Sequence, residues 1–202
     1  MYELADKGIR YLNKQYVTMF RRLNSVLKAD ELNIMAAVNK LFADIDPMVK
    51  DVLLRIARGT YKEIRGDHED VIDMMFVLAL MEDYDPITRY VYTGEMDRKR
   101  SRLIEALIAT RSPEEVETAM KIWARQTTQA CIEITDRAAL KAYKDMGVKK
   151  VVWETEEDTR VCEVCEDRQG KVYRIDKVPT KPHYRCRCWL RPFVEGGEIW
   201  PL

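Results

Sequence analysis

The sequence predicts a mainly α-helical protein that ends in a small β-containing module stabilised by zinc. The chain of 202 residues has only 8 glycines and 7 prolines, and 34% of it is charged, which is typical of helix-rich proteins. Apolar residues recur at steps of three and four as far as Gly147, a helical period. Beyond Gly147 the runs become short, β-branched and aromatic. We therefore expect a helical body, residues 1–147, and a β/zinc-binding module, residues 148–202.

The helical body is expected to contain six helices, over residues 2–28, 31–43, 47–65, 68–82, 95–109 and 113–146. Asp30 is placed to cap the second helix. We expect a break at Asp44-Ile-Asp-Pro47, because proline disfavours helix in the residue before it. Asp46 would then cap the third helix, with Pro47 in its first turn. Helix 68–82 is the most apolar, and its His68 is predicted to lie at the surface. Residues 87–94 are predicted to be irregular.

The last helix has the clearest boundaries. Ser112 is a fitting N-cap, Pro113 suits the first helical position, and Glu115 would close a capping box. Gly147 is a fitting residue just beyond the other end, although a break near 125–129 or 135–136 stays open. Cys131 lies inside this helix and is predicted to be a small core residue. Strands are expected over 148–153, 171–175 and 188–192.

Two short motifs in the C-terminal module bring together three of the five cysteines and one of the two histidines of the chain. Cys162-Glu-Val-Cys165 presents two thiols from one turn, and His183-Tyr-Arg-Cys186 supplies an imidazole and a third thiol. Zinc takes four such ligands in a tetrahedron, so the motifs predict a structural zinc site. A disulfide or redox pair and reduced core thiols are the alternatives. An odd number of cysteines without a signal peptide argues against a secreted disulfide framework.

Cys188 is a fifth candidate ligand. If residues 186–190 are extended, the Cα atoms of Cys186 and Cys188 lie about 6.6 Å apart. The sulfurs bound to one zinc must converge to under about 4 Å. We therefore expect only one of the two to bind, unless Cys186-Arg-Cys188 forms a turn. The HxxC spacing favours Cys186.

The same motifs give little support to a catalytic metal. A nucleobase deaminase needs an HxE motif before a PCxxC motif, whereas here the CxxC motif comes first and no glutamate follows His183. A nuclease of the HNH type needs a catalytic histidine in addition to its ligands, and the other histidine, His68, is distant in sequence. We predict that the protein is not an enzyme, with a metal-dependent nuclease kept as an alternative.

The charges balance, with 34 basic and 34 acidic residues, so no global excess points to nucleic acid or to a membrane surface. The N-terminus lacks a signal pattern, and the longest apolar run, 74–81, is too short to span a bilayer. We expect a soluble protein of a reducing compartment. Around the cysteines the balance is locally basic. Arg160, Arg185 and Arg187 are candidate contacts to nucleic acid or an acidic partner, or they merely offset thiolate charge.

The order and spacing of the C-terminal motifs resemble one known family, the phage head morphogenesis or minor head proteins, of which phage Mu protein F is the namesake. The resemblance covers residues 123–192. It rests on Ala124-Arg-Gln-Thr-Thr128, Tyr143-Lys-Asp-Met-Gly147, Val151-Val-Trp-Glu-Thr155, Asp158-Thr-Arg-Val-Cys162-Glu-Val-Cys165, Gly170 and Pro182-His-Tyr-Arg-Cys-Arg-Cys188, ending in Pro192. Tyr184 stands where the family often has a second proline, which can alter the local turn but keeps the candidate ligands.

The resemblance implies a minor capsid component in the virion, inside the head near the portal and assembled in the host cytoplasm. It implies a part in head assembly and in DNA packaging or delivery. The expected partners are the portal protein and other capsid proteins, with direct contact to viral DNA left open. No membrane, small-molecule substrate or catalytic role follows from it. The competing reading is a zinc-finger-like nucleic-acid-binding module.

Overall fold

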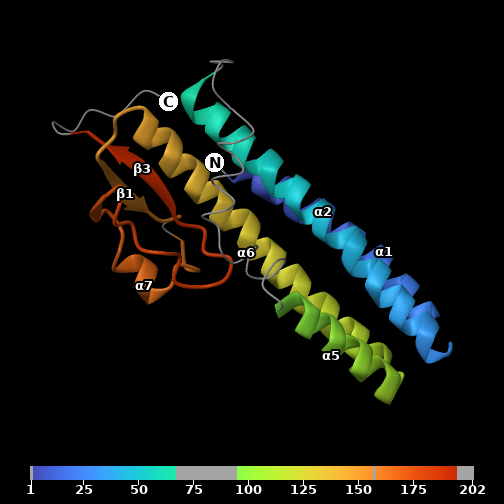
Figure 1. Cartoon of the computed structure of the whole chain (residues 1–202). Coiled ribbons are helices and arrows are strands. Elements are labelled where there is room, and N and C mark those ends of the chain that lie inside the picture. Colours follow the sequence, from blue (N-terminus) through green and yellow to red (C-terminus); the bar gives the residue numbers. More distant parts are fainter. Residues whose placement is uncertain (1, 67–94, 157, 195–202) are drawn as a thin grey trace.

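The computed structural model describes residues 2–66, 95–156 and 158–194. The predicted helix 68–82, His68 and the irregular stretch 87–94 lie outside these residues. Within the described residues, long helices lie side by side, and a three-stranded sheet rests against one of them near the C-terminal end of the chain (Figure 1). This arrangement confirms the predicted fold class, a mainly helical protein with a small β element.

The first two helices form an antiparallel pair. Helix α1 spans Glu3–Ser25 and helix α2 spans Glu31–Arg65. Asp30 caps α2 as predicted, because its carboxylate accepts a hydrogen bond of 2.9 Å from the backbone N–H of Asn33. The inward face of α1 is apolar and buried, with Leu12, Tyr16, Phe20 and Leu23 at helical spacing.

Helix α2 passes through Pro47 without a break, so the predicted boundary at Asp44-Ile-Asp-Pro47 and the predicted cap at Asp46 are wrong. Proline removes one helical hydrogen bond and disfavours the interior of a helix by about 3 kcal/mol. Packing outweighs this penalty, because Phe42, Ile45, Val49 and Leu53 continue one buried face across the proline. Asp46 is partly buried instead of capping, and this burial raises the pKa of its carboxyl.

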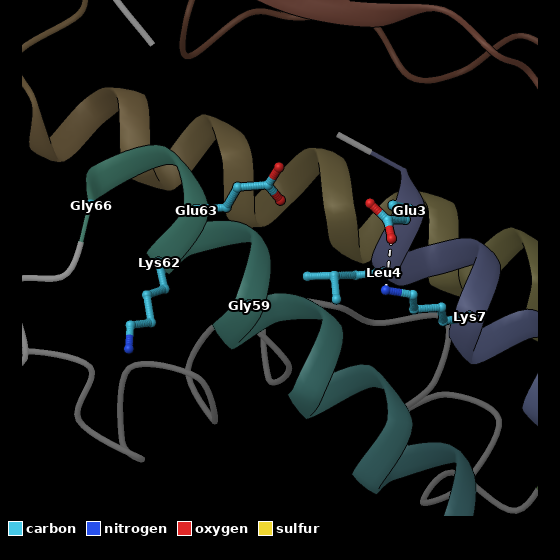
Figure 2. Close-up of a pocket in the computed structure, with 7 residues that line it drawn as sticks. All are labelled: Glu3, Leu4, Lys7, Gly59, Lys62, Glu63 and Gly66. Carbon is cyan, nitrogen blue, oxygen red and sulfur yellow. Dashed lines mark ion pairs between the residues drawn. The ribbon is translucent and has the colours of Figure 1, made fainter.

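Two glycines allow α1 and α2 to approach closely. A β-carbon added at Gly8 would lie 2.8 Å from Val52 Cγ1 and 2.9 Å from Ile56 Cδ1. A β-carbon at Gly59 would lie 2.5 Å from Leu4 Cδ1. Figure 2 shows the side chain of Leu4 extending from α1 toward α2 near Gly59. The pocket in this view has a volume of about 430 Å³, and its rim includes the ion pair of Glu3 and Lys7 at 2.7 Å.

Helices α5, Glu95–Thr110, and α6, Pro113–Asp145, complete the bundle. Ser112 caps α6, but its hydroxyl bonds the backbone N–H and the carboxylate of Glu114, one residue before the predicted partner Glu115. At the other end, Val148 N–H donates to Tyr143 C=O and Gly147 has a φ of 83°. This is a Schellman ending, as Gly147 predicts. Helix α6 runs unbroken between these caps.

The core of the bundle gathers on α6. The Trp123 ring lies 5.2 Å from the Phe20 ring of α1 and 4.8 Å from the Phe42 ring of α2, centroid to centroid. Cys131 is fully buried in the same cluster, which confirms its predicted place in the core. In the described residues, no helix is both long and apolar enough to cross a bilayer.

The sheet contains strands β1 Lys150–Glu154, β2 Val172–Arg174 and β3 Trp189–Phe193, with a short helix α7 at Glu163–Glu166. Strand β1 is central and pairs antiparallel with both others, so that Val151 lies opposite Tyr173 and Pro192. The sheet buries Val151 and Trp153 against Ala139 and Tyr143 of α6. Because α6 contributes to this second core, the division at residue 147 stays a prediction.

Candidate metal centre

Five side chains converge beside the sheet, and they are the five that the motifs predict. Cys162 and Cys165 come from the start and middle of α7, His183 from a turn, and Cys186 and Cys188 from the segment leading into β3. Their ligand atoms form two groups, each within 4.8 Å: Cys162, Cys165 and His183, and Cys165, Cys186 and Cys188. Cys165 belongs to both groups and stands at the centre of the cluster.

The spacings within the cluster suit one metal ion. Cys165 Sγ lies 3.6 Å from His183 Nε2 and 3.5 Å from Cys186 Sγ. Two thiolates on a tetrahedral zinc lie about 3.8 Å apart. All five cysteines of the chain are free thiols. Burial raises the pKa of the Cys165 and Cys186 thiols, so a divalent cation would have to displace their protons to bind.

Cys186 and Cys188 both reach the cluster, since the sulfurs of Cys165, Cys186 and Cys188 all lie within 4.8 Å of one another. The strand begins only at Trp189, and Arg185 has a φ of 57°, which reverses the chain just before Cys186. Of residues 186–190, Trp189 and Leu190 belong to strand β3, and an extended backbone over 186–188 stays a prediction. Each sulfur lies within 4.8 Å of Cys165 Sγ. Which four of the five candidates bind stays a prediction.

Local hydrogen bonds orient the candidate ligands. His183 Nδ1 lies 3.0 Å from the carbonyl oxygen of Tyr184. The tautomer that donates from Nδ1 leaves the lone pair of Nε2 free to bind a metal. In α7, the carbonyl of Cys162 accepts the N–H of Cys165 at 2.9 Å, which places both thiols on one turn. These bonds orient the imidazole and the CxxC turn.

The space at the cluster is small. A cavity of about 30 Å³ opens there, lined by Cys165, His183, Cys186, Cys188 and arginine side chains. This volume suits a single ion or water. Sites for small organic ligands measure about 300–1,000 Å³. The cavity therefore has the size of a site for a single metal ion.

The basic side chains predicted near the cysteines are partly neutralised by a carboxylate. Arg187 binds Asp158 with both guanidinium branches, one at 2.7 Å, and Arg160 binds the same carboxylate at 3.1 Å. These bonds hold the pKa of Asp158 well below its usual range. Arg185 instead lies over the ring of Tyr184, with its guanidinium carbon 5.5 Å from the ring centroid. A contact role for the three arginines stays a prediction.

A buried group that the sequence does not reveal adjoins the cluster. The side chain of Lys181 is only 4% exposed and lies 3.4 Å from Asp136 of α6. Its ammonium donates to the Tyr2 hydroxyl at 2.7 Å and to the carbonyl of Cys188. The Tyr2 hydroxyl in turn donates to Asp136. Tyr2, Asp136 and Lys181 thus join the start of the chain, helix α6 and residues 181–188, called the metal loop below.

The fold and the site define a mainly helical protein with a small cysteine- and histidine-bearing module that could hold a metal ion. The family described as Phage Mu protein F like protein matches residues 85–191, just over half of the chain. The chain belongs to this family, as the resemblance predicts. The chain has no significant match among curated proteins or among solved structures. Family membership suggests phage head morphogenesis, capsid partners and a virion location, and the family is generally structural, not enzymatic.

Proposed function

We propose that this chain is a minor component of a phage head, placed inside the head near the portal, where it acts by contacts and not by catalysis. Its part lies in head assembly and in DNA packaging or delivery. The observation that carries the proposal is the family match over residues 85–191, which contains every candidate metal ligand. The small cavity at the cluster suits a bound ion in a structural role.

The proposal includes one structural zinc ion held by Cys162, Cys165, His183 and Cys186, with Cys188 as the alternative ligand. Three strands of three to five residues bury little core of their own. Zinc bound to a short module contributes about 10–16 kcal/mol in model peptides. Cys165, Cys186 and Cys188 lie in the same buried cluster as Trp153 and Leu190. The ion would therefore hold the loops onto the sheet.

Co-assembly tests the placement in the head. The chain is expressed together with the portal and major capsid proteins encoded in the same genome, and the particles are separated by sedimentation. We expect the chain to sediment with the heads and to remain bound to the portal after the heads are dissociated. A chain that stays at the top of the gradient while portal-containing heads form would contradict the proposal. Cys165→Ser, which removes the central thiol, is expected to reduce incorporation, whereas Cys131→Ser is not.

A further inference from the structure

We propose that Arg125, Tyr184 and Arg185 form a docking surface for an acidic segment of a partner protein. The three residues are called the arginine clamp below. The guanidinium carbons of Arg125 and Arg185 lie 5.0 and 5.5 Å from the centroid of the Tyr184 ring. Arg125 comes from α6 and the other two from the metal loop, so the clamp bridges the helical body and the module. It rests on the proposed function, whose partners it describes.

The ring contact prepares the two guanidinium groups for binding. An arginine stacked on an aromatic ring keeps its N–H donors available at the edge of the guanidinium plane. Those donors match a carboxylate in a two-point hydrogen bond. Because the ring already restricts both side chains, less conformational entropy is lost when a partner binds.

Charge pairing distinguishes the clamp from four of the other five arginines of the module, and the fifth, Arg168, donates instead to the carbonyl of Thr180. Arg160 and Arg187 bind Asp158, Arg174 binds Asp176, and Arg191 binds Glu154. Arg125 and Arg185 make ring contacts with Tyr184 and have no carboxylate partner in the described part of the chain. Both are exposed. Their charges are therefore available to a carboxylate from outside.

The surroundings favour a protein partner over DNA. Ile122 lies three residues before Arg125, hence on the same side of α6, and is 48% exposed. Arginine, tyrosine and an apolar side chain together are typical of protein interfaces. DNA-binding surfaces are strongly positive, whereas Arg160 and Arg187, which line the same small cavity as Arg185, are paired with Asp158.

The test uses the full chain, labelled with ¹⁵N, and follows the Nε–Hε signals of its arginines by NMR. The probe is a peptide of three Glu-Glu-Leu-Leu repeats, compared with the same peptide carrying glutamine for glutamate and with a duplex DNA of arbitrary sequence. We expect the acidic peptide to shift the signals of Arg125 and Arg185. The glutamine peptide and the DNA should leave them unchanged at the same ionic strength. The double variant Arg125→Gln/Arg185→Gln should bind the peptide about tenfold more weakly than the wild type. Arg10→Gln, the matched control at an exposed position, should bind it like the wild type.

Two results would overturn the inference. Shifts caused by DNA and not by the acidic peptide would assign the clamp to nucleic acid, and the absence of any shift would reduce it to an internal packing contact. The co-assembly experiment separates this failure from failure of the proposed function. If the clamp binds no acidic peptide and the double variant enters heads like the wild type, only the clamp is refuted. If the wild type does not enter heads, the proposed function fails whatever the clamp binds.

Discussion

The buried ammonium of Lys181 is one of the contacts that join the metal loop to the helical body. Lys181 lies between Asp136 and the carbonyl of Cys188, with its ammonium 5.6 Å from the centroid of the Trp153 ring. Burial raises the pKa of Asp136, and the nearby ammonium of Lys181 opposes that rise. A buried carboxyl and a buried ammonium are tolerated only while each compensates the other. The position of the loop that carries His183 therefore depends on this pair.

Replacing Lys181 should destabilise the protein strongly. Lys181→Met leaves Asp136 buried without its cation, which we expect to lower the free energy of unfolding by about 3 kcal/mol. The double variant Lys181→Met/Asp136→Leu should recover part of the lost free energy of unfolding, because neither charge of the pair then remains buried. Lys177→Met at an exposed position is the matched control. Urea denaturation measures all four proteins, and equal stabilities for Lys181→Met and the control would contradict the prediction.

The contribution of Asp145 should depend on pH. Burial raises the pKa of this carboxyl, but hydrogen bonds from Lys141 and Tyr61 outweigh burial, so the net pKa is lowered. A lowered pKa in the folded state stabilises the protein above the unfolded value, about 3.9, and this stabilisation is lost as the pH falls through the folded value. Asp145→Asn should thus cost under about 1 kcal/mol at neutral pH.

The measurement is the difference in unfolding free energy between wild type and Asp145→Asn at several pH values. We expect the difference to be full above about pH 4 and to be lost as the pH falls through the lowered folded-state pKa. Asp51→Asn, which removes an exposed pair with Arg55, serves as the control and should change stability little. A difference for Asp145→Asn that stays constant as the pH falls would show that the ion pair is not its source.

At the candidate site, the metal ligands could be predicted from the sequence, whereas the ion-pair partners could not. The five metal candidates could be found because a CxxC motif and an HxxC motif have a characteristic spacing. The ion pairs of Arg187 with Asp158 and of Lys181 with Asp136 could not be found in this way. Their partners lie about 30 and about 45 positions apart in the sequence. No local pattern marks such pairs, because they depend on how the elements pack.

At the scale of elements, helix ends were predictable and helix interruptions were not. Asp30, Ser112 and Gly147 act through bonds to neighbouring residues, so the sequence around them suffices to identify them. The break expected at Pro47 fails because its neighbours pack against other helices. A local rule predicts a boundary correctly only where tertiary packing does not oppose it.

The close approach of α1 and α2 predicts that alanine at Gly8 destabilises the protein more than alanine at Gly59. Gly8→Ala would press a methyl group against Val52, whose branched side chain has few alternative rotamers. We expect a net loss of about 1–2 kcal/mol, even though alanine favours the helix by about 1 kcal/mol over glycine. Gly59→Ala meets only the flexible tip of Leu4 (Figure 2) and should be close to neutral.

Urea denaturation of the two variants provides the measurement, and each variant is the other's control because both place the same methyl group on a helix. A larger loss for Gly59→Ala than for Gly8→Ala would contradict the packing described for the two helices. Equal gains in both variants would mean that helix propensity alone decides and that the helices are not in close contact at these glycines.

At the scale of the whole molecule, two hydrophobic clusters meet along α6. The larger one joins α1, α2, α5 and α6, and the smaller one joins the end of α6 to the sheet and to three of the cysteines. The sequence predicted both kinds of region through the change of period at Gly147. It did not predict that Ala139 and Tyr143, before that glycine, belong to the smaller core, because a helical period does not say which neighbour a face will meet.

The choice among the candidate ligands can be read from single variants. We expect Cys162→Ser and Cys186→Ser to lose zinc and Cys188→Ser to keep it, in line with the HxxC spacing. Elemental analysis of each purified variant gives the answer, with circular dichroism as a check on folding. Loss of zinc in Cys188→Ser alone would transfer the fourth position from Cys186 to Cys188, which the geometry around Cys165 also accommodates.

The most direct test of the central claim, that the cluster holds one structural zinc ion, is the metal content of the full chain purified without added metal. We predict one zinc ion per chain in the wild type and in Cys131→Ser, whose thiol lies buried in the helical core. Cys165→Ser removes the thiol common to both groups of candidate ligands and should contain none. Wild-type protein without metal, or Cys165→Ser with its full zinc content, would contradict the claim.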